Sequence, residues 1–147
     1  MKKIMKWISG TVVRGYGVAG GRATDCPFPG GSIRLQQPFF MAKGMDISRY
    51  YPATLNVDLA PHVPKPAAVV FDGLLHWQGD LREHFVLSEI ELEVKGKRYA
   101  GLWYCPDPAT KVAHFHSASM VELLLPWIDG LNTGEIVKVG FCDRNGE

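Results

Sequence analysis

Residues 90–103 form the segment whose structure is most strongly constrained by its local sequence. Residues 90–94 alternate between apolar and acidic side chains, residues 95–97 read Lys-Gly-Lys, and residues 98–103 return with Tyr99, Leu102 and Trp103. Such alternation is typical of a strand with one buried face, and a short glycine-containing turn between two such runs indicates a β-hairpin. A short turn also fixes the register of the two strands. We therefore expect antiparallel β-structure here.

Turn-forming residues divide the rest of the chain into short segments of the same kind. Sixteen glycines and ten prolines separate runs rich in Val, Ile, Leu, Trp and Tyr, which is the pattern of an all-β barrel or sandwich. Helical propensity is confined to short patches, such as residues 39–44 and 79–85. The expected strands are residues 7–14, 32–36, 54–59, 67–71, 85–94, 98–104, 112–116, 121–125 and 135–141.

Length and charge limit the classes of protein to which the chain can belong. With 147 residues, 46% of them apolar, residues 1–147 fit a single domain that buries a core without disulfides or a structural metal. The formal net charge is only +1, so there is no broad electrostatic surface for nucleic acid or for an anionic membrane. We expect neither as a partner.

Cysteine usage and the N-terminus indicate a cytoplasmic setting. Cys26, Cys105 and Cys142 are isolated and odd in number, so neither a disulfide framework nor a zinc site is expected. The N-terminal basic residues are followed by Ser9 and Gly10, which interrupt the apolar run before it reaches signal-peptide length. A reducing compartment is the simplest expectation.

Three side chains that carry oxygen alternate along the strand expected at residues 54–59. Thr54, Asn56 and Asp58 should share one face, because alternate residues of a strand point the same way. Hydroxyl, amide and carboxylate oxygens suit Mg²⁺, which proteins often hold through one or two groups while waters and substrate phosphates complete the shell. A polar strand face turned to solvent is the alternative.

Two further segments are candidates for ligand binding. A glycine-rich loop would let backbone N–H groups approach a phosphate, although it matches neither the Walker A nor the Rossmann pattern, and turn formation is the alternative. His114 and His116 would share a strand face and could bind zinc or copper with a third ligand; packing or simple exposure is the alternative. The loop consists of Gly15, Tyr16, Gly17, Val18, Ala19 and Gly20.

Three blocks, in this order, resemble the archaeal-type CTP-dependent riboflavin kinases. Pro52-Ala53-Thr54-Leu55-Asn56 is similar to the family's Pro-Gly-Thr-Leu-Asn motif, and residues 94–101 are similar to the hairpin before its middle strands. Residues 116–126 resemble the family's His-Ser and Glu-x-x-x-Pro run. The similarity extends, with interruptions, from about Gly10 to about Phe141.

This resemblance implies a fold and an activity. The fold would be all-β, a closed six-stranded riboflavin kinase-like barrel with short helices and long loops. The activity would be Mg²⁺-dependent phosphoryl transfer from CTP to riboflavin, giving FMN. Thr54 and Asn56 would bind the metal, Glu122 would contact the flavin, and His114 stands where a flavin-contacting threonine would be. The loop at residues 15–20 would lie near the nucleotide phosphates.

Two further roles follow once this chemistry is assumed. Asp58 would be the catalytic residue, either as an outer group of the metal site or as the acceptor of the hydroxyl proton. Trp103 and Trp127 lie near the blocks that resemble the flavin-binding part, so one of them could stack on a planar ligand, with core packing as the alternative.

The chain also departs from the family pattern. Ala53 replaces a glycine, the first loop lacks the acid and the third glycine of Gly-x-Gly-Glu-Gly, and Trp127-Ile128 follows Pro126 where the family has Leu-Arg. Residues 25–37 look like an added lobe. These differences leave two alternatives open, namely a non-catalytic flavin- or nucleotide-binding barrel, and a structural interaction protein whose lobe fills the mouth of the barrel.

Overall fold

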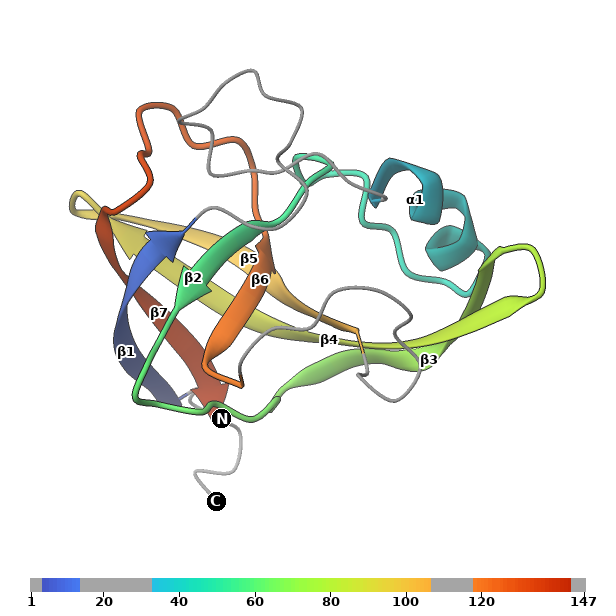
Figure 1. The fold of residues 1–147 in the computed structure, drawn as a ribbon, viewed down its shortest axis with the longest axis horizontal. Helices are drawn as coiled ribbons and strands as arrows, with labels where there is room; N and C mark the ends of the chain where they lie inside the picture. The colour runs from blue at the N-terminus through green and yellow to red at the C-terminus, as the bar shows by residue number, and fades with distance from the viewer. Residues whose placement is uncertain (1–3, 14–32, 107–117, 144–147) are drawn as a thin grey trace.

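Six antiparallel strands form a closed barrel, and a seventh strand extends the sheet beyond it (Figure 1). The computed structural model describes residues 4–13, 33–106 and 118–143. The strand order is β3-β4-β5-β6-β2-β1-β7, and an additional β4–β7 pairing closes the ring, so the expected all-β, six-stranded barrel is confirmed. The elements are β1 (Ile4–Val13), α1 (Ile33–Ala42), β2 (Leu55–Asp58), β3 (Val69–Gln78), β4 (Leu81–Val94), β5 (Lys97–Pro106), β6 (Met120–Leu124) and β7 (Ile136–Asp143).

The interior of the barrel is the first of two hydrophobic cores. It is filled by alternate residues of the barrel strands, since successive side chains of a strand point to opposite faces. Trp103 and Phe141 pack edge to face there, with ring centroids 5.5 Å apart. The buried strand residues of this core include Ile8, Val12, Leu55, Val57, Ile90, Leu92, Trp103, Val121, Leu123, Val137, Val139 and Phe141.

The second core lies outside the barrel, where α1 and β3 cover the outer face of β4, β5 and β6. Phe40 of α1 contacts Phe71 of β3 and Phe85 of β4, with ring centroids 5.2 and 5.4 Å apart. In Figure 1, α1 lies over the β3–β4 hairpin, which projects to one side of the barrel. The fully buried members of this core are Ile33, Phe40, Ile47, Leu75, Phe85, Leu87, Leu102, Tyr104 and Leu124.

The hairpin expected around residues 95–97 is confirmed, with a tighter turn than the sequence indicated. Val94 pairs with Lys97, so only Lys95 and Gly96 form the turn. Both have positive φ, 52° and 78°, as a type I′ turn requires. Lys95 Nζ also donates to the carbonyl of Gly130, at 2.8 Å, and this contact joins the turn to the loop before β7.

Most other expected strands match β1 to β7, and their ends differ by a few residues. The strand expected at residues 67–71 runs on to Gln78, and the one expected at residues 112–116 lies outside the described residues. The helical patch at residues 39–44 overlaps the end of α1. In the described ranges, no helix has both the length and the apolar character needed to span a membrane.

Two local predictions are wrong. Residues 33–36, expected in a strand, are helical, and the helix buries Ile33, Gln36 and Phe40 at helical spacing. The patch at residues 79–85, expected to favour helix, instead turns at Gly79, which has a φ of 59°, and enters β4. Pairing of this segment with β3 outweighs a weak local preference for helix.

Candidate functional site

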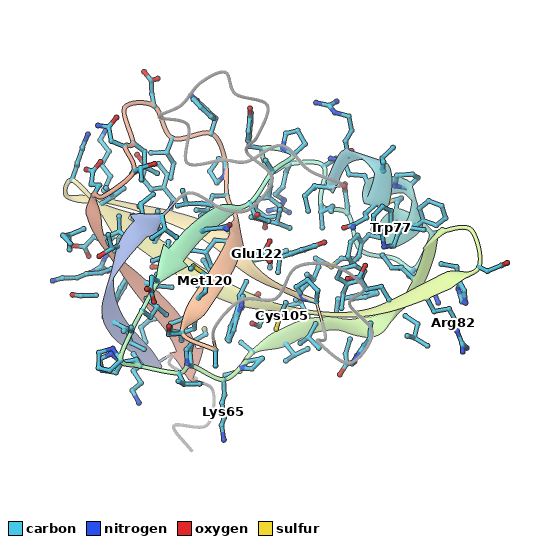
Figure 2. The ribbon with its side chains drawn as sticks, viewed as in Figure 1. Lys65, Trp77, Arg82, Cys105, Met120 and Glu122 are labelled. Carbon is cyan, nitrogen blue, oxygen red and sulfur yellow. The ribbon has the colours of Figure 1, made fainter. Side chains whose placement is uncertain are left out.

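Strand register brings together two side chains that the resemblance assigned to different ligands. Asn56 of β2 lies directly opposite Glu122 of β6. Their neighbours Leu55, Val57, Val121 and Leu123 all enter the barrel core. Alternation therefore places Asn56 and Glu122 together on the outer face. In Figure 2, Glu122 lies on the side of the barrel toward α1.

Thr54 completes this outer-face cluster. Its hydroxyl Oγ1 is 3.1 Å from Glu122 Oε1 and 3.3 Å from Asn56 Oδ1. Thr54 and Asn56 are buried, whereas Glu122 is half-buried. The structure thus brings together an alcohol, an amide and a carboxylate oxygen, and Glu122 is the most exposed of the three residues.

The distances between these oxygens can be compared with the distances between the ligands of a small divalent cation. Adjacent ligands of an octahedral Mg²⁺, each about 2.0–2.1 Å from the metal, lie about 2.9 Å apart. The two distances from Thr54 Oγ1 exceed this by a few tenths of an ångström. Both contacts are hydrogen bonds in which the Thr54 hydroxyl is the donor, so a bound cation would have to replace them. The single carboxylate of the cluster leaves positions for water or phosphate oxygens.

A buried phenol borders the cluster on the next strand. Tyr104 of β5 lies opposite Glu122 in the β5–β6 pairing, and its hydroxyl donates to Gln36 Oε1 of α1 at 2.8 Å. Burial raises the pKa of Tyr104 well above its usual value, and the charge of Glu122 raises it further. Tyr104 therefore stays protonated at physiological pH and acts as a hydrogen-bond donor rather than as a base.

Asp58 lies on the same strand face as Asn56, but its carboxylate accepts hydrogen bonds from the neighbouring loops. Its Oδ1 accepts from Ser119 Oγ at 2.8 Å and from the backbone N–H of Ala60 at 3.0 Å. These contacts join the end of β2 to the residue before β6. Asp58 therefore has a structural role at this end of the strand pair, whatever its part in chemistry.

The remaining predicted site residues divide into two groups. His114 and the loop at residues 15–20 lie outside the described residues. The two tryptophans are described and differ sharply, since Trp103 is buried in the barrel core and Trp127 is 50% exposed. Trp127 is therefore the more accessible of the two rings.

Sequence reasoning missed Gln36 and Tyr104. Gln36 was expected in a strand, and Tyr104 was noted only as the last residue of one. A polar residue at a buried helical position, spaced with Ile33 and Phe40, is the signal that could have indicated Gln36, because a buried amide needs a partner. No local signal identifies Tyr104 as that partner, since the two residues are 68 positions apart.

A separate hollow on the outer face of β4 and β5 lies away from this cluster. It has a volume of about 200 Å³, and its lining includes Arg49, Tyr50, Glu89 and Leu102. Ligand pockets usually enclose about 300–1,000 Å³. Neither the oxygen cluster nor Tyr104 is among its lining residues, so the hollow and the cluster are separate features. We take the oxygen cluster as the candidate site because it holds Thr54, Asn56 and Glu122, which were predicted from the sequence.

No protein-family model matches the chain, and no curated protein matches it at a significant level. The described part of the chain also holds no group of three or more His, Cys, Asp or Glu side chains placed to bind a metal. The oxygen cluster itself combines one carboxylate, that of Glu122, with the neutral oxygens of Thr54 and Asn56.

Proposed function

We propose that the chain catalyses Mg²⁺-dependent phosphoryl transfer from a nucleoside triphosphate, CTP or a similar nucleotide, to riboflavin, giving FMN. The observation that supports this is the convergence of Thr54 Oγ1, Asn56 Oδ1 and Glu122 Oε1 within 3.1–3.3 Å contacts. The choice of substrates comes from the resemblance to CTP-dependent riboflavin kinases. The oxygen cluster supplies the physical argument for a cation at that place.

The three residues of the oxygen cluster would bind different ligands. Thr54 and Asn56 would hold Mg²⁺, whose charge neutralises the phosphate oxygens when bound. Glu122 is half-buried, and its carboxylate would orient the flavin beside the metal pair. Tyr104 and Gln36 exclude water from the α1 side, because both are buried and hydrogen-bonded to each other. Positioning and electrostatics account for most of the acceleration in this chemistry.

Asp58 would accept the proton of the attacking riboflavin hydroxyl, or would support the metal from outside its ligand shell. It stands two residues from Asn56 on the same strand face, about 7 Å further along. The hydrogen bond from Ser119 fixes the orientation of its carboxylate. A fixed orientation is what a general base requires.

A flavin- or nucleotide-binding barrel without transfer activity is the second candidate. The observation that favours it is that Asp58 Oδ1 already accepts two hydrogen bonds. An oxygen occupied by two donors is less available to a substrate hydroxyl. In this alternative the oxygen cluster would bind a flavin or a nucleotide, but no phosphoryl group would be transferred to riboflavin.

Chromatographic detection of FMN tests the proposal directly. The pure protein is incubated with riboflavin, Mg²⁺ and each of the four common nucleoside triphosphates in turn. FMN formed with CTP supports the full proposal, and FMN formed only with another nucleotide corrects the donor. No FMN with any donor, together with measurable riboflavin binding, would favour the binding barrel.

Two variants then test the metal assignment. Thr54→Val removes the hydroxyl and keeps the branched shape, and Asn56→Ala removes the amide oxygen. Each should lower turnover at least about 100-fold and leave the fold intact. Thr133→Val, at an exposed position of the β6–β7 loop, is the matched control and should remain fully active. Unchanged turnover in both site variants would disprove the metal role.

A further inference from the structure

The strand β3 forms one edge of the sheet. Within the described ranges it pairs only with β4, because the ring closes through β4 and β7 and leaves β3 outside it. In Figure 1, β3 runs along the border of the hairpin that projects from the barrel. An edge strand presents a row of backbone N–H and C=O groups to which another strand can pair.

The sequence of β3 carries little of the protection that edge strands usually have. Such strands are commonly short or interrupted by Lys or Pro. β3 has ten residues and contains neither Lys nor Pro, whereas strands average about five to six residues. Its irregularities fall toward the two ends and leave residues 71–75 in regular pairing with β4. Val69, Val70 and Leu74 are 47%, 42% and 39% exposed. The strand is therefore suited to accept a further strand.

The exposed face of β3 has a self-complementary order of side chains. Asp72, Leu74 and His76 are exposed, whereas Leu75 is buried and Trp77 packs against the second core on the α1 side (Figure 2). The exposed face therefore reads acid, leucine and histidine at alternate positions. An antiparallel copy of the same strand reads histidine, leucine and acid against it.

We propose that β3 pairs antiparallel with β3 of a second copy of this chain, about a two-fold axis at Leu74. In this register the Leu74 side chains of the two copies meet, and Asp72 of each copy lies opposite His76 of the other. Directly opposite side chains have Cβ atoms about 4.5–5.5 Å apart, and pairs of opposite charge stabilise a sheet. This dimer does not depend on the proposed phosphoryl transfer.

The other face of β3 also accommodates this register. Phe71 of each copy would lie opposite Trp77 of the other, and both rings already pack against the second core. Aromatic pairs across strands are favourable. Gly73 would lie opposite Leu75, so that the residue without a side chain faces the buried leucine. The same register therefore suits both faces of the strand.

Asp72 has room for a second contact. Its Oδ1 contacts Nε2 of His84 in the same hairpin at 2.5 Å, and its side chain is still 62% exposed. A carboxylate has two oxygens and accepts several hydrogen bonds. The ring N–H of His76 from the second copy can therefore donate to Asp72 while the contact with His84 is kept.

Sedimentation velocity of the full chain at several concentrations tests for the dimer. The wild type should change from monomer to dimer as the concentration rises, because pairing of one strand buries less area than a standard interface. Leu74→Lys places like charges opposite each other and should weaken the dimer at least about tenfold. Leu35→Lys, at a position of α1 that is 66% exposed, is the matched control and should dimerise as the wild type does.

Two variants of His76 test the charge pairing. His76→Lys places a full positive charge opposite Asp72 and should strengthen the dimer about three- to tenfold, whereas His76→Asp should weaken it by a similar factor. Each substitution acts twice in a symmetric dimer. An association through apolar contacts alone would not respond to the two variants with opposite signs, so equal effects of both would overturn the proposal.

Oxidative cross-linking tests the register. Leu74→Cys places two thiols directly opposite each other and should form a covalent dimer. Val70→Cys is the control, because it is comparably exposed and its two thiols would lie about 26 Å apart along the strands. Neither this variant nor the wild type, which has cysteines of its own, should cross-link.

Three results would overturn the proposal. The first is a wild type that stays monomeric at every concentration. The second is a dimer that Leu35→Lys disrupts and Leu74→Lys leaves intact, because the contact would then lie on α1. The third is equal cross-linking of Leu74→Cys and Val70→Cys, which is incompatible with a two-fold axis at Leu74. If Leu74→Lys fails to fold, the opposite responses of the two His76 variants still decide the question.

Discussion

The Tyr104 hydroxyl donates to Gln36 Oε1 across 2.8 Å, and this hydrogen bond joins β5 to α1 within a core that is otherwise apolar. Both residues are buried. A polar contact in such surroundings is directional, whereas apolar packing tolerates sliding. The pair therefore fixes the position of α1 over the barrel next to Glu122.

Replacing Tyr104 by Phe should destabilise the protein by about 1–3 kcal/mol, because Gln36 Oε1 would stay buried without its donor. The double variant Tyr104→Phe/Gln36→Leu should recover much of this loss, since both polar partners are then removed. Urea denaturation gives the free energies. Tyr99→Phe, at a partly buried position, is the control and should change stability little. A double variant as unstable as the single one would contradict this explanation.

The same tyrosine should make the protein sensitive to alkaline pH. Its pKa is raised in the folded state, first by burial and then by the charge of Glu122, whereas the unfolded phenol titrates near 10.0. Its contribution to stability is therefore fully present below about pH 10 and is lost as the pH rises further. Denaturation at about pH 8 and about pH 10.5 should show a smaller difference in Tyr104→Phe than in the wild type. Equal differences would contradict the prediction.

Glu122→Gln should weaken Mg²⁺ binding at least about tenfold, because it keeps the shape of the side chain but removes the negative charge that contacts Thr54. Isothermal titration calorimetry in the presence of triphosphate measures the effect. Glu91→Gln, half-buried on β4, removes an equal charge elsewhere and should bind Mg²⁺ as the wild type does. Equal weakening in both variants would indicate a general effect of net charge.

Asp58→Asn should lower kcat by about 100-fold or more if Asp58 is the base, with little change in riboflavin affinity. Ser119→Ala removes the hydrogen bond from Ser119 to Asp58 Oδ1 but keeps the Asp58 carboxylate. This variant therefore distinguishes a structural role of Asp58 from a catalytic one. A large loss in Asp58→Asn with near-normal rates in Ser119→Ala supports the catalytic role. Similar losses in the two variants would instead support a purely structural role.

Gly101→Ala should destabilise the barrel by about 1–3 kcal/mol or prevent folding, because a Cβ there would lie 2.3 Å from the Leu124 carbonyl oxygen. Gly73→Ala is the matched control. Its Cβ would meet only the Phe71 ring, at 3.2 Å, and a side chain can move more easily than backbone. Thermal melts of the two variants should therefore differ clearly, and equal melting temperatures would be evidence against close strand packing at Gly101.

Features set by neighbouring residues could be predicted from sequence, and features set by distant contacts could not. The hairpin around Lys95 and Gly96 was predicted correctly because its alternation and turn are local. The first part of the helix at residues 33–42 was predicted as a strand. Gln36 interrupts its apolar stripe, and the partner of this buried glutamine is Tyr104, 68 residues away. The polar residue in the buried face of the helix is explained only by its hydrogen bond with Tyr104.

The candidate site shows the same division. Alternation placed Thr54 and Asn56 on one strand face, and the contact between their side chains agrees with that. The approach of Glu122 to Thr54 depends on the β2–β6 register, which no local pattern indicates. The resemblance brought Glu122 into the same functional site, but as a flavin contact rather than as a neighbour of the metal pair.

Closure of the ring through β1 and β7 has a consequence for how the protein is made. Met5 of β1 pairs with Cys142 of β7. The barrel therefore cannot close until β7 has been made. Pairing between such distant segments is slow, since a long loop must be ordered before any contact is gained. On the ribosome, the half-made sheet would expose its unpaired edges until β7 has been synthesised. Expression at low temperature or with chaperones should therefore raise the soluble yield.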